Sequence, residues 1–283
     1  MIETWMQQNA EPAQFILFFG LLALFSLVEL LAPRRRHGRN RSKRWAANFT
    51  LTLLNLIVMA LLPVTFVGAA AWAQDLGLGL LNLMPLPMIA LFASTMFLRG
   101  FISFITHYLG HHVPWFWRVH RVHHLDPELD VSTTVRFHPL EFAINLAIGV
   151  PLVVGLGLTP WVLLAYEVLD AGVVLFSHAN VRLPGPIDRL LRYLIVTPDL
   201  HRVHHSRWQP ETNSNFGAVF PIWDILFGTF RTSTRQPHES MELGLEGVPE
   251  ERTTALRWLL TSPFQPSDNK TSSTLSRPTV STL

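Results

Sequence analysis

Residues 120–124 read HRVHH, and residues 201–205 repeat the same pentapeptide. Side chains three and four residues apart share one face of an α-helix, about 5–6 Å from one another. Each pentapeptide therefore predicts a helix that presents three imidazoles on one side. Eleven of the thirteen histidines lie between residues 107 and 205, so the two pentapeptides belong to a larger cluster.

The spacing of these histidines predicts a metal centre. Two imidazoles at i and i+4 can converge on one ion, and a third at i+3 lets the same helix reach a second ion. Neutral imidazole is a ligand for iron, zinc and copper. Imidazoles clustered without a metal would repel as soon as protons bound, which favours a metal over a chance grouping. Two zinc ions would use about eight ligands, and two irons with open positions also fit this number.

Four aspartates lie near the pentapeptides in sequence, and two interpretations stay open for each. Such a carboxylate could hydrogen-bond a ligating imidazole and orient it, or it could be a solvated loop or capping residue. The four are Asp126, Asp130, Asp199 and Asp224. His37 and His238 stand apart from the cluster, and we interpret them as histidines without a metal role.

The composition indicates a membrane protein. Apolar residues make up 49% of the 283-residue chain and charged residues 15%, against roughly 25% charged in soluble domains. The absence of cysteine excludes disulfides, iron–sulfur clusters, thiolate zinc sites and covalent c-type haem. Seven basic residues fall between Arg34 and Arg44 beside an apolar run, a pattern of membrane topology rather than of nucleic-acid binding.

Three uncharged stretches near the N-terminus predict membrane helices. They cover residues 12–28, 45–74 and 76–98, and each is long enough to cross about 30 Å of hydrocarbon as a helix. The first has no preceding Lys or Arg, so it predicts an anchor rather than a secretory signal. Asp75 predicts a short turn, and Pro85 and Pro87 suit the first turn of the third helix.

A further apolar region, residues 142–177, predicts a helical hairpin. Gly155, Gly157 and Pro160 near its middle favour a break there, so the chain would enter and leave the membrane on the same side. The alternative is one long helix plus a buried amphipathic one. By the positive-inside rule the loop 34–44 is cytoplasmic, and counting crossings from it places every internal histidine group on the cytoplasmic face.

The chain is predicted to divide into four regions. Residues 1–95 form the N-terminal membrane anchor, and residues 96–231 form a histidine-box catalytic domain that includes the hairpin at about 141–177. Residues 232–260 form a polar C-terminal segment. Residues 261–283, rich in Ser, Thr and Pro, are predicted to be a disordered tail.

From about residue 96 to Phe230 the chain resembles the fatty acid hydroxylase/sterol desaturase superfamily of integral membrane di-metal enzymes. The resemblance rests on an ordered set of motifs: HYLGH at 107–111, WRVHRVHH at 117–124, RFHPLE at 136–141, SHAN at 177–180, TPDLHRVHH at 197–205, NFG at 215–217 and WDILFGT at 223–229. The last two are expected to form a loop that closes the cap, or a plain turn with buried aromatics.

The resemblance implies an all-α integral membrane fold. About four transmembrane helices, two plus a hairpin-forming pair, would carry a cytosolic, helical, histidine-rich cap. It implies two iron ions (with zinc possible in purified protein), O₂ as co-substrate, and a separate electron donor such as a reductase, ferredoxin or cytochrome. The reaction would be hydroxylation or desaturation of a C–H bond in a fatty acyl, sterol or related lipid.

The ligands that the resemblance implies all belong to the matching motifs. They are His107, His111, His120, His123, His124, His178, His201, His204 and His205. His138, beside Pro139, is interpreted as structural or as a partner of a ligand, and no catalytic side chain is expected beyond the ligands. The family's first motif usually has Arg after its first His and an acidic residue seven positions earlier, where this chain has Tyr108 and Gly100.

Two other functions compete with a lipid oxidase. A zinc-binding membrane transporter or sensor would need polar residues deep in its helices, and the spans before His107 are nearly free of them. A bis-histidine b-type haem carrier would leave the HxxHH spacing unexplained. The expected location is a bacterial inner membrane, or the endoplasmic reticulum of a eukaryote, with no nucleic-acid partner. The lipid is expected to come from the bilayer, past Met96, Phe97, Phe101, Phe104, Val174 and Phe176.

Overall fold

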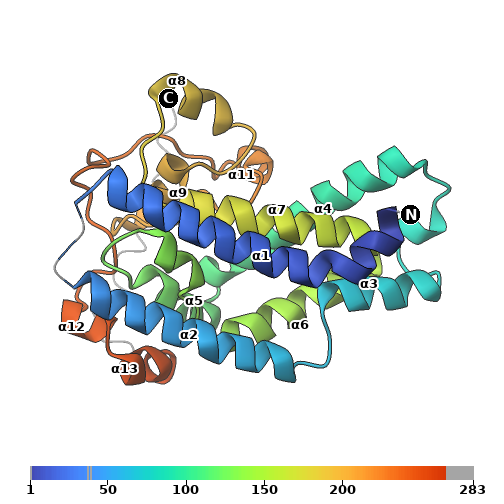
Figure 1. Cartoon of the computed structure of the whole chain (residues 1–283), viewed down its shortest axis with the longest axis horizontal. Coiled ribbons are helices and arrows are strands. Elements are labelled where there is room, and N and C mark those ends of the chain that lie inside the picture. The colour runs from blue at the N-terminus through green and yellow to red at the C-terminus, as the bar shows by residue number, and fades with distance from the viewer. Residues whose placement is uncertain (1, 37, 39, 266–283) are drawn as a thin grey trace, which may run out of the picture.

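The computed structural model describes residues 2–36, 38 and 40–265 and, within the first helix, side chains from residue 16 onward. These residues form helices and one isolated β-bridge, between Ser206 and Leu243. The long helices run roughly along one axis, and the short helices gather at one end as a cap (Figure 1). The all-α class predicted from the sequence is confirmed.

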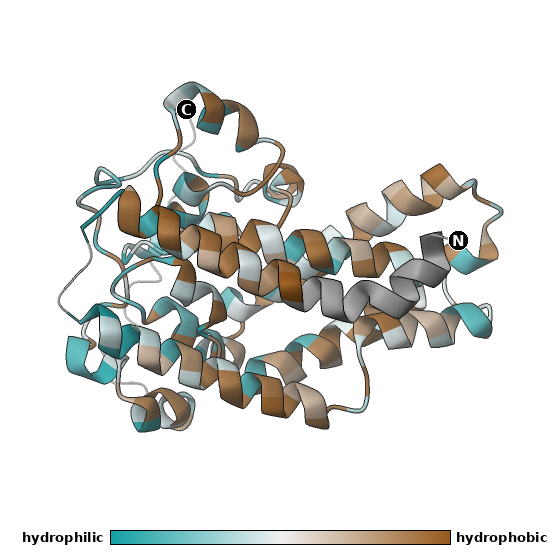
Figure 2. Ribbon diagram, in the orientation of Figure 1, coloured by the Kyte–Doolittle hydropathy of each residue, from teal (hydrophilic) through white to brown (hydrophobic). Residues whose placement is uncertain are grey.

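Among the described residues, four segments are long and apolar enough to cross a membrane. They are Arg41–Asp75, Met88–His112 (α4), Pro139–Leu156 (α6) and Pro160–His178 (α7). Figure 2 shows hydrophobic residues along these helices, with hydrophilic ones concentrated in the cap and in turns at the opposite end. The chain is therefore a multi-pass membrane protein with the predicted number of about four spans.

The boundaries of the first two spans differ from the uncharged stretches that predicted them. The first span is divided into α2 (Arg41–Leu61) and α3 (Phe66–Asp75), because Pro63 interrupts it and the Thr65 hydroxyl caps α3 by accepting from the Gly68 N–H at 3.0 Å. The next helix, α4, begins only at Met88. Residues 76–87 form a turn and a short 3₁₀ helix, η1 (Leu81–Leu83).

The predicted hairpin is present in place of one long helix. Helix α6 ends at Leu156, Gly157 adopts a left-handed conformation (φ 66°), and α7 begins at Pro160. The tip of this hairpin lies against the turn after α3, where the Leu80 N–H donates to the Gly155 carbonyl at 3.0 Å. A Cβ on Gly79 would lie 2.3 Å from the Gly157 nitrogen, so this approach requires glycine.

The apolar run predicted at residues 12–28 is part of α1 (Ile2–Leu31). Within the part of α1 whose side chains are described, the apolar stretch is Ile16–Leu31. It lies along α7 (Figure 1), where Leu22 joins a buried cluster with Leu175. This contact holds the cap end of α7 in place.

The cap is made of short helices. Its elements are α5 (Pro114–His124), η2 (Val131–Val135), α8 (Gly185–Leu191), α9 (Pro198–His204), α10 (Gln209–Thr212), α11 (Ile222–Phe227), α12 (Glu250–Thr253), α13 (Leu256–Thr261) and η3 (Ser262–Phe264). Helix α4 runs unbroken through residue 95, so the predicted anchor and histidine-box regions share it. Of the predicted tail, residues 261–264 belong to α13 and η3, and residues 266–283 lie outside the described residues.

Candidate metal centre

The structure brings all nine predicted histidines together at the junction of spans and cap. They come from α4, α5, α7 and the α9 segment, and they form two groups. The five-histidine group is His107, His111, His120, His124 and His204, and the four-histidine group is His123, His178, His201 and His205. Within each group the candidate ligand atoms all lie within 4.8 Å of one another.

The two pentapeptides each contribute to both groups, with their roles exchanged. In the first, the i and i+4 histidines (His120 and His124) face the five-histidine group, and the i+3 histidine, His123, faces the other. In the second, His201 and His205 face the four-histidine group, and the i+3 histidine, His204, faces the five-histidine group. The groups touch, because the His124 and His205 ring centroids are 4.6 Å apart. The arrangement suits two adjacent ions, which in two-metal sites lie about 4 Å apart.

Neighbouring Nε2 atoms are spaced like ligands of a common ion. In the five-histidine group His124 Nε2 lies 3.1 Å from His111 Nε2 and 3.2 Å from His120 Nε2. In the other group the successive Nε2 separations from His123 through His178 and His201 to His205 are 3.2, 3.0 and 3.1 Å. Two ligands at right angles, each about 2.1 Å from an ion, would be about 3 Å apart.

The hydrogen bonds of the Nδ1 atoms show that the Nε2 atoms of His123 and His178 face each other without a proton. His178 Nδ1 donates to the Val174 carbonyl at 2.8 Å, and His123 Nδ1 to the Arg136 carbonyl at 3.3 Å, because a carbonyl can only accept. Their Nε2 atoms therefore meet at 3.2 Å as two lone pairs. Such an arrangement is repulsive unless a cation lies between them. The donor set, neutral imidazole alone, fits a transition metal.

Two further buried Nε2 atoms lack a partner. His204 Nδ1 donates to the Ser214 carbonyl at 2.7 Å, and His107 Nδ1 to the Phe216 carbonyl at 2.8 Å. Each ring is thereby fixed with its Nε2 lone pair directed into the five-histidine group, where neither atom has a hydrogen-bond partner among the described residues. An unsatisfied buried acceptor is costly, and a bound ion would satisfy both.

Burial keeps the cap histidines neutral. It lowers the pKa of His123, His124, His201 and His205 well below the usual value, and the neighbouring imidazoles lower these pKa values further. Burial lowers the pKa of His204 to about 3 against the hydrogen bond to Ser214. Imidazole binds metal in its neutral form, so near pH 7 these rings are ready to act as ligands.

One carboxylate contacts a candidate ligand directly, and the sequence analysis missed it. Glu141 Oε1 accepts from His120 Nδ1 at 2.6 Å, and both side chains are buried. This pairing fixes the orientation of the ring. The available signal was an acidic residue in the first turn of the otherwise apolar α6, within the RFHPLE motif.

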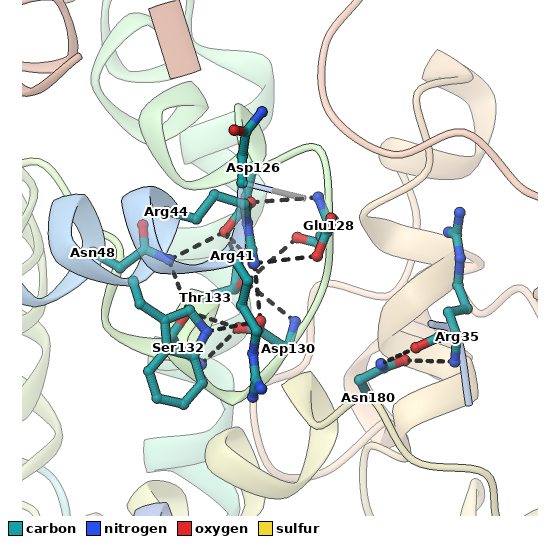
Figure 3. Close-up of polar contacts among 12 residues, drawn as sticks. Arg35, Arg41, Arg44, Asn48, Asp126, Glu128, Asp130, Ser132, Thr133 and Asn180 are labelled. Carbon is teal, nitrogen blue, oxygen red and sulfur yellow. Dashed lines mark hydrogen bonds and ion pairs between the residues drawn. The ribbon is translucent and has the colours of Figure 1, made fainter. Parts of the chain in front are cut away.

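The first pentapeptide is held through the loop that follows it. Arg44 of α2 binds Asp126 at 2.5 Å and Asp130 at 2.9 Å, and Asn48 joins the same network (Figure 3). Asn48 also accepts from Arg136 Nη1 at 2.8 Å. Because the Arg136 carbonyl is the acceptor for His123, this chain of contacts connects α2 to the four-histidine group.

The four aspartates do not bind the candidate ligands directly. Among the described contacts, none of the four hydrogen-bonds to any of the nine rings. Asp126 and Asp130 bind Arg44, Asp199 binds Arg34, and Asp224 accepts from main-chain N–H groups. Of the two interpretations left open from the sequence, the structure supports a role in the loops. Three of the four, however, are buried rather than solvated.

The NFG and WDILFGT motifs form one unit that orients two ligands. Asp224 accepts from the Phe216 and Gly217 N–H groups at 2.7 and 2.8 Å. Asn215 donates to the Leu200 carbonyl of α9 at 3.0 Å. These bonds position the carbonyls of residues 214 and 216, which accept from His204 and His107. The loop thus does more than close the cap.

The remaining histidines lie outside both groups. His112 is exposed and its Nδ1 donates to the Tyr108 carbonyl at 2.8 Å. His138 caps α6, accepts from the Leu140 N–H at 3.2 Å, and donates to the Leu260 carbonyl at 3.1 Å, a structural role. His238 Nε2 lies 3.9 Å from an Asp199 oxygen. His37 is outside the described residues.

The two departures from the family pattern have local partners. A Cβ on Gly100 would lie 3.3 Å from the Trp223 indole nitrogen, so the small residue lets α11 approach α4 closely. Tyr108 stacks on His112 with ring centroids 3.9 Å apart. Aromatic packing therefore occupies the places where the family pattern has charged side chains.

The residues expected along the lipid route lie in more than one place. Phe97, Phe101 and Phe104 of α4 pack against Trp223 or Phe227 of α11, with ring centroids 4.2 to 5.2 Å apart. Phe176 faces α1 instead, in a groove of about 540 Å³ between α1 and α7. The α4–α11 cluster leads to the histidines, because Phe104 contacts Phe216, whose ring lies beside His107.

Comparison with known proteins agrees with the geometry. A family model described as fatty acid hydroxylase matches residues 92–229. The ornithine lipid hydroxylase OlsE of Rhizobium tropici is 30% identical over 240 residues, which cover 82% of this chain and 70% of that protein. The alkylglycerol monooxygenase of Caenorhabditis elegans is 29% identical over 48% of this chain and 26% of its own.

Human cholesterol 25-hydroxylase is 29% identical over 46% of this chain and 47% of its own. No solved structure gives a significant match. The similarity to OlsE extends over most of both chains, and the family model covers the segment that contains all nine histidines. The chain therefore belongs to the fatty acid hydroxylase family, as a membrane enzyme whose two histidine groups are suited to a two-metal centre.

Proposed function

We propose that the nine histidines hold two iron ions, and that the enzyme uses O₂ to hydroxylate a C–H bond of a polar membrane lipid. One observation carries the choice of metal. The five-histidine group offers five imidazoles, four of them buried, to one ion, whereas protein-bound zinc takes four ligands in most sites. Iron accepts five or six ligands and leaves a position for O₂.

The reaction needs reactants from outside the chain. One atom of O₂ enters the C–H bond and the other leaves as water, so each turnover consumes two electrons and two protons. When bound, the ions supply the O₂ chemistry that acid–base groups lack. The side chains hold and orient: Glu141 keeps a proton on His120 Nδ1, and Phe104 and Phe216 keep water from the membrane side of the centre.

The lipid reaches the centre between α4 and α11. The aromatic cluster of these two helices connects His107 with the apolar edge of α11, where Leu226 and Phe227 are exposed. An apolar path of this kind suits a lipid chain, which needs few polar contacts. The close approach of α11 at Gly100 would then limit the width of the path.

An amino-acid lipid is the substrate class that we propose. Its support is the relative named ornithine lipid hydroxylase, which matches 82% of this chain, whereas the alkylglycerol and cholesterol enzymes match less than half. All three relatives are named as hydroxylases or monooxygenases, which favours hydroxylation over desaturation.

The cap faces the cytoplasm in this proposal. The arginine-rich loop lies at the cap end, where Arg34 binds Asp199 and Arg44 binds Asp126. The positive-inside rule places such a loop on the cytoplasmic side. The membrane would be the inner membrane of a bacterium, or the endoplasmic reticulum of a eukaryote.

A zinc-binding transporter is the second candidate, and one observation favours it. Arg99 in α4 and Glu167 and Asp170 in α7 lie within membrane spans, where ionisable groups often mark a transport path. Arg99 is nevertheless bound within the protein, by Ser103 Oγ at 2.6 Å and by two aromatic rings, each 4.9 Å away. We therefore assign it a role in helix packing.

The experiment uses purified protein in nanodiscs that contain ornithine lipid. The iron-loaded protein is reduced with dithionite and exposed to isotopically labelled O₂, and the lipid is analysed by mass spectrometry together with the metal content. We expect about two irons per chain and one labelled oxygen in the lipid, with His204→Ala as the inactive control. Zinc alone with unchanged lipid would favour the transporter, and an unlabelled, desaturated product would replace hydroxylation.

A further inference from the structure

An exposed tryptophan lies between two arginines on the cap. The Cζ atoms of Arg231 and Arg235 are 5.7 and 5.6 Å from the Trp208 ring centroid, and the Trp208 residue is 39% exposed. Arg207 precedes it with its side chain 37% exposed. We call Arg207, Trp208, Arg231 and Arg235 the Trp208 face. The proposed reaction gives it no role.

Buried polar residues fix this face in place. Asn215, 1% exposed, accepts from the Arg231 N–H and donates to the Arg231 carbonyl, both at 2.8 Å. Glu211, also 1% exposed, accepts from the Arg235 N–H. The face is therefore organised before any partner arrives, which lowers the entropic cost of binding.

The Trp208 face connects to both histidine groups by short routes. Along the chain, Trp208 follows His205 of the four-histidine group by three residues. Across α10, the Trp208 carbonyl accepts from the Thr212 N–H at 3.1 Å. The next residue, Asn213, accepts from His111 Nδ1 at 3.3 Å. Electron transfer through protein weakens with distance and favours covalent and hydrogen-bonded connections, so this face is a good entrance for electrons.

We propose that the Trp208 face is the docking surface for an acidic, soluble one-electron carrier protein with an iron–sulfur or haem centre. The proposal rests on the function above, which needs two electrons per turnover. Two carrier molecules, each oxidised by one electron, would supply them in succession. The carrier's carboxylates would meet the arginine guanidinium groups, and its surface would cover the Trp208 ring.

Charge and chemistry favour such a partner. The face has three arginines, of which only Arg207 has a carboxylate neighbour among the described ion pairs, Glu242 at 3.6 Å. Trp and Arg are the residues that most often dominate binding energy at protein interfaces, and opposite charges steer fast, transient encounters. The loop from α11 to α12 lies at the cap end of the molecule, away from the hairpin tip (Figure 1). A soluble carrier can therefore reach it.

The test compares two double charge reversals in the iron-loaded enzyme. Arg231→Glu with Arg235→Glu reverses the face, and Arg252→Glu with Arg257→Glu makes the same charge change at exposed positions near α12 and α13. Each protein is reduced either by a reduced acidic ferredoxin or by dithionite, and lipid oxidation and metal content are measured. Dithionite needs no docking, so it separates loss of the face from loss of the centre.

We expect the first variant to lose at least about tenfold in ferredoxin-driven rate at low salt. Its dithionite-driven oxidation and iron content should remain those of the wild type, as should all properties of the control variant. Added salt should slow the wild type and not the first variant. Trp208→Ala should weaken ferredoxin binding on the order of tenfold, and Trp208→Phe less.

Three outcomes would overturn the docking proposal. The first is a reversed face that accepts electrons from ferredoxin at the wild-type rate. The second is an equal fall in ferredoxin-driven and dithionite-driven rates, which would make the face merely structural. The third is a wild-type enzyme that oxidises lipid when dithionite supplies the electrons but does not do so when an acidic carrier supplies them. A wild type that oxidises no lipid even with dithionite would instead overturn the proposed function.

Discussion

The two HRVHH pentapeptides have the same sequence but different surroundings. The first lies on the 11-residue α5, and a carboxylate, Glu141, accepts from its leading histidine. The second lies on the 7-residue α9 and its following residue, where a main-chain carbonyl accepts from His204. Helical spacing thus fixes which imidazoles share a face, and the neighbouring loops decide how firmly each is held.

The loops that follow the pentapeptides also differ. Loop 125–136 is held by the buried ion pairs of Arg44. Loop 206–217 is held mainly by neutral hydrogen bonds of Asn215 and by main-chain N–H groups that donate to the Asp224 carboxylate. Because the pentapeptides exchange roles between the two groups, neither loop serves one ion alone. The same histidine pentapeptide is therefore supported by buried ion pairs in one place and mainly by hydrogen bonds in the other.

The largest expected effect comes from the two histidines that cross between the groups. His123→Ala or His204→Ala should lower turnover by more than the 10–100-fold that is typical of lost outer partners, because each removes a candidate ligand. Iron content should fall from about two to about one per chain, measured by elemental analysis. His112→Ala, next to His111, and His238→Ala should change turnover and iron content little. Full activity in His204→Ala would remove our ligand assignment.

The next effect should distinguish the two loops. Arg44→Met leaves Asp126 and Asp130 buried without their cation, which costs about 3–5 kcal/mol and lowers the melting temperature by about 10 °C. Asn215→Ala removes neutral hydrogen bonds and should cost about 2 kcal/mol. Thermal unfolding in one detergent would compare them. Equal losses would mean that the ion pairs hold their loop no more firmly than the neutral bonds.

A smaller effect should separate the two pentapeptides themselves. Glu141→Gln weakens the hold on His120, so the five-histidine group should lose about 10–100-fold in metal affinity. No ring of the four-histidine group has a carboxylate partner among the described contacts, so the metal affinity of that group should be unchanged. A chelator titration that follows the release of each iron would show one weakened site. Two equally weakened sites would contradict this division.

The smallest effect is on the response of the loops to acid. Burial alone would raise the pKa of Asp130, but Arg44, Ser132 and Trp45 lower it to about 2, below the usual 3.8. Its carboxylate therefore stabilises the folded state above about pH 4, and about 2 kcal/mol is lost as the pH falls towards 2. Burial raises the pKa of Asp224, so acid favours the folded form of the second loop.

Hydrogen exchange at pH 4 and pH 2, corrected for intrinsic rates, would measure this contrast. Residues 125–136 should lose protection on acidification, and residues 213–229 should keep it. Asp130→Asn, which cannot titrate, provides the control. If both loops loosened in parallel, the acid response would belong to the whole cap rather than to Asp130.

Much of the fold could be predicted because burial in lipid leaves a strong pattern in the sequence. The apolar runs located the spans, and Gly157 with Pro160 located the hairpin tip. The uncharged stretch 76–98 predicted the third helix, with Pro85 and Pro87 in its first turn, whereas α4 begins at Met88. The stretch is longer than the helix because an apolar turn that packs in the membrane has the composition of a span. Hydropathy does not report the close backbone contact between Gly79, in the turn before α4, and Gly157.

The histidine cluster could be predicted because i, i+3 and i+4 spacing is local. The roles of Glu141 and Arg44 could not, because they depend on contacts across 21 and 82 residues of sequence. The aspartates after the first pentapeptide were noticed, but the sequence alone does not show that their partner is an arginine on α2. Nor does it show which main-chain carbonyls accept from the rings.

The exchange of histidines between the groups has a consequence for how the protein survives in a cell. Where a metal site forms only in the folded chain, binding energy is also folding energy, and ligand at a hundred times its dissociation constant adds about 2.7 kcal/mol. Because the α5 and α9 segments each contribute to both histidine groups, losing one bound ion would loosen the site of the other. Under iron starvation we therefore expect half-loaded chains to be degraded, so that the amount of enzyme, and not only its activity, follows the iron supply.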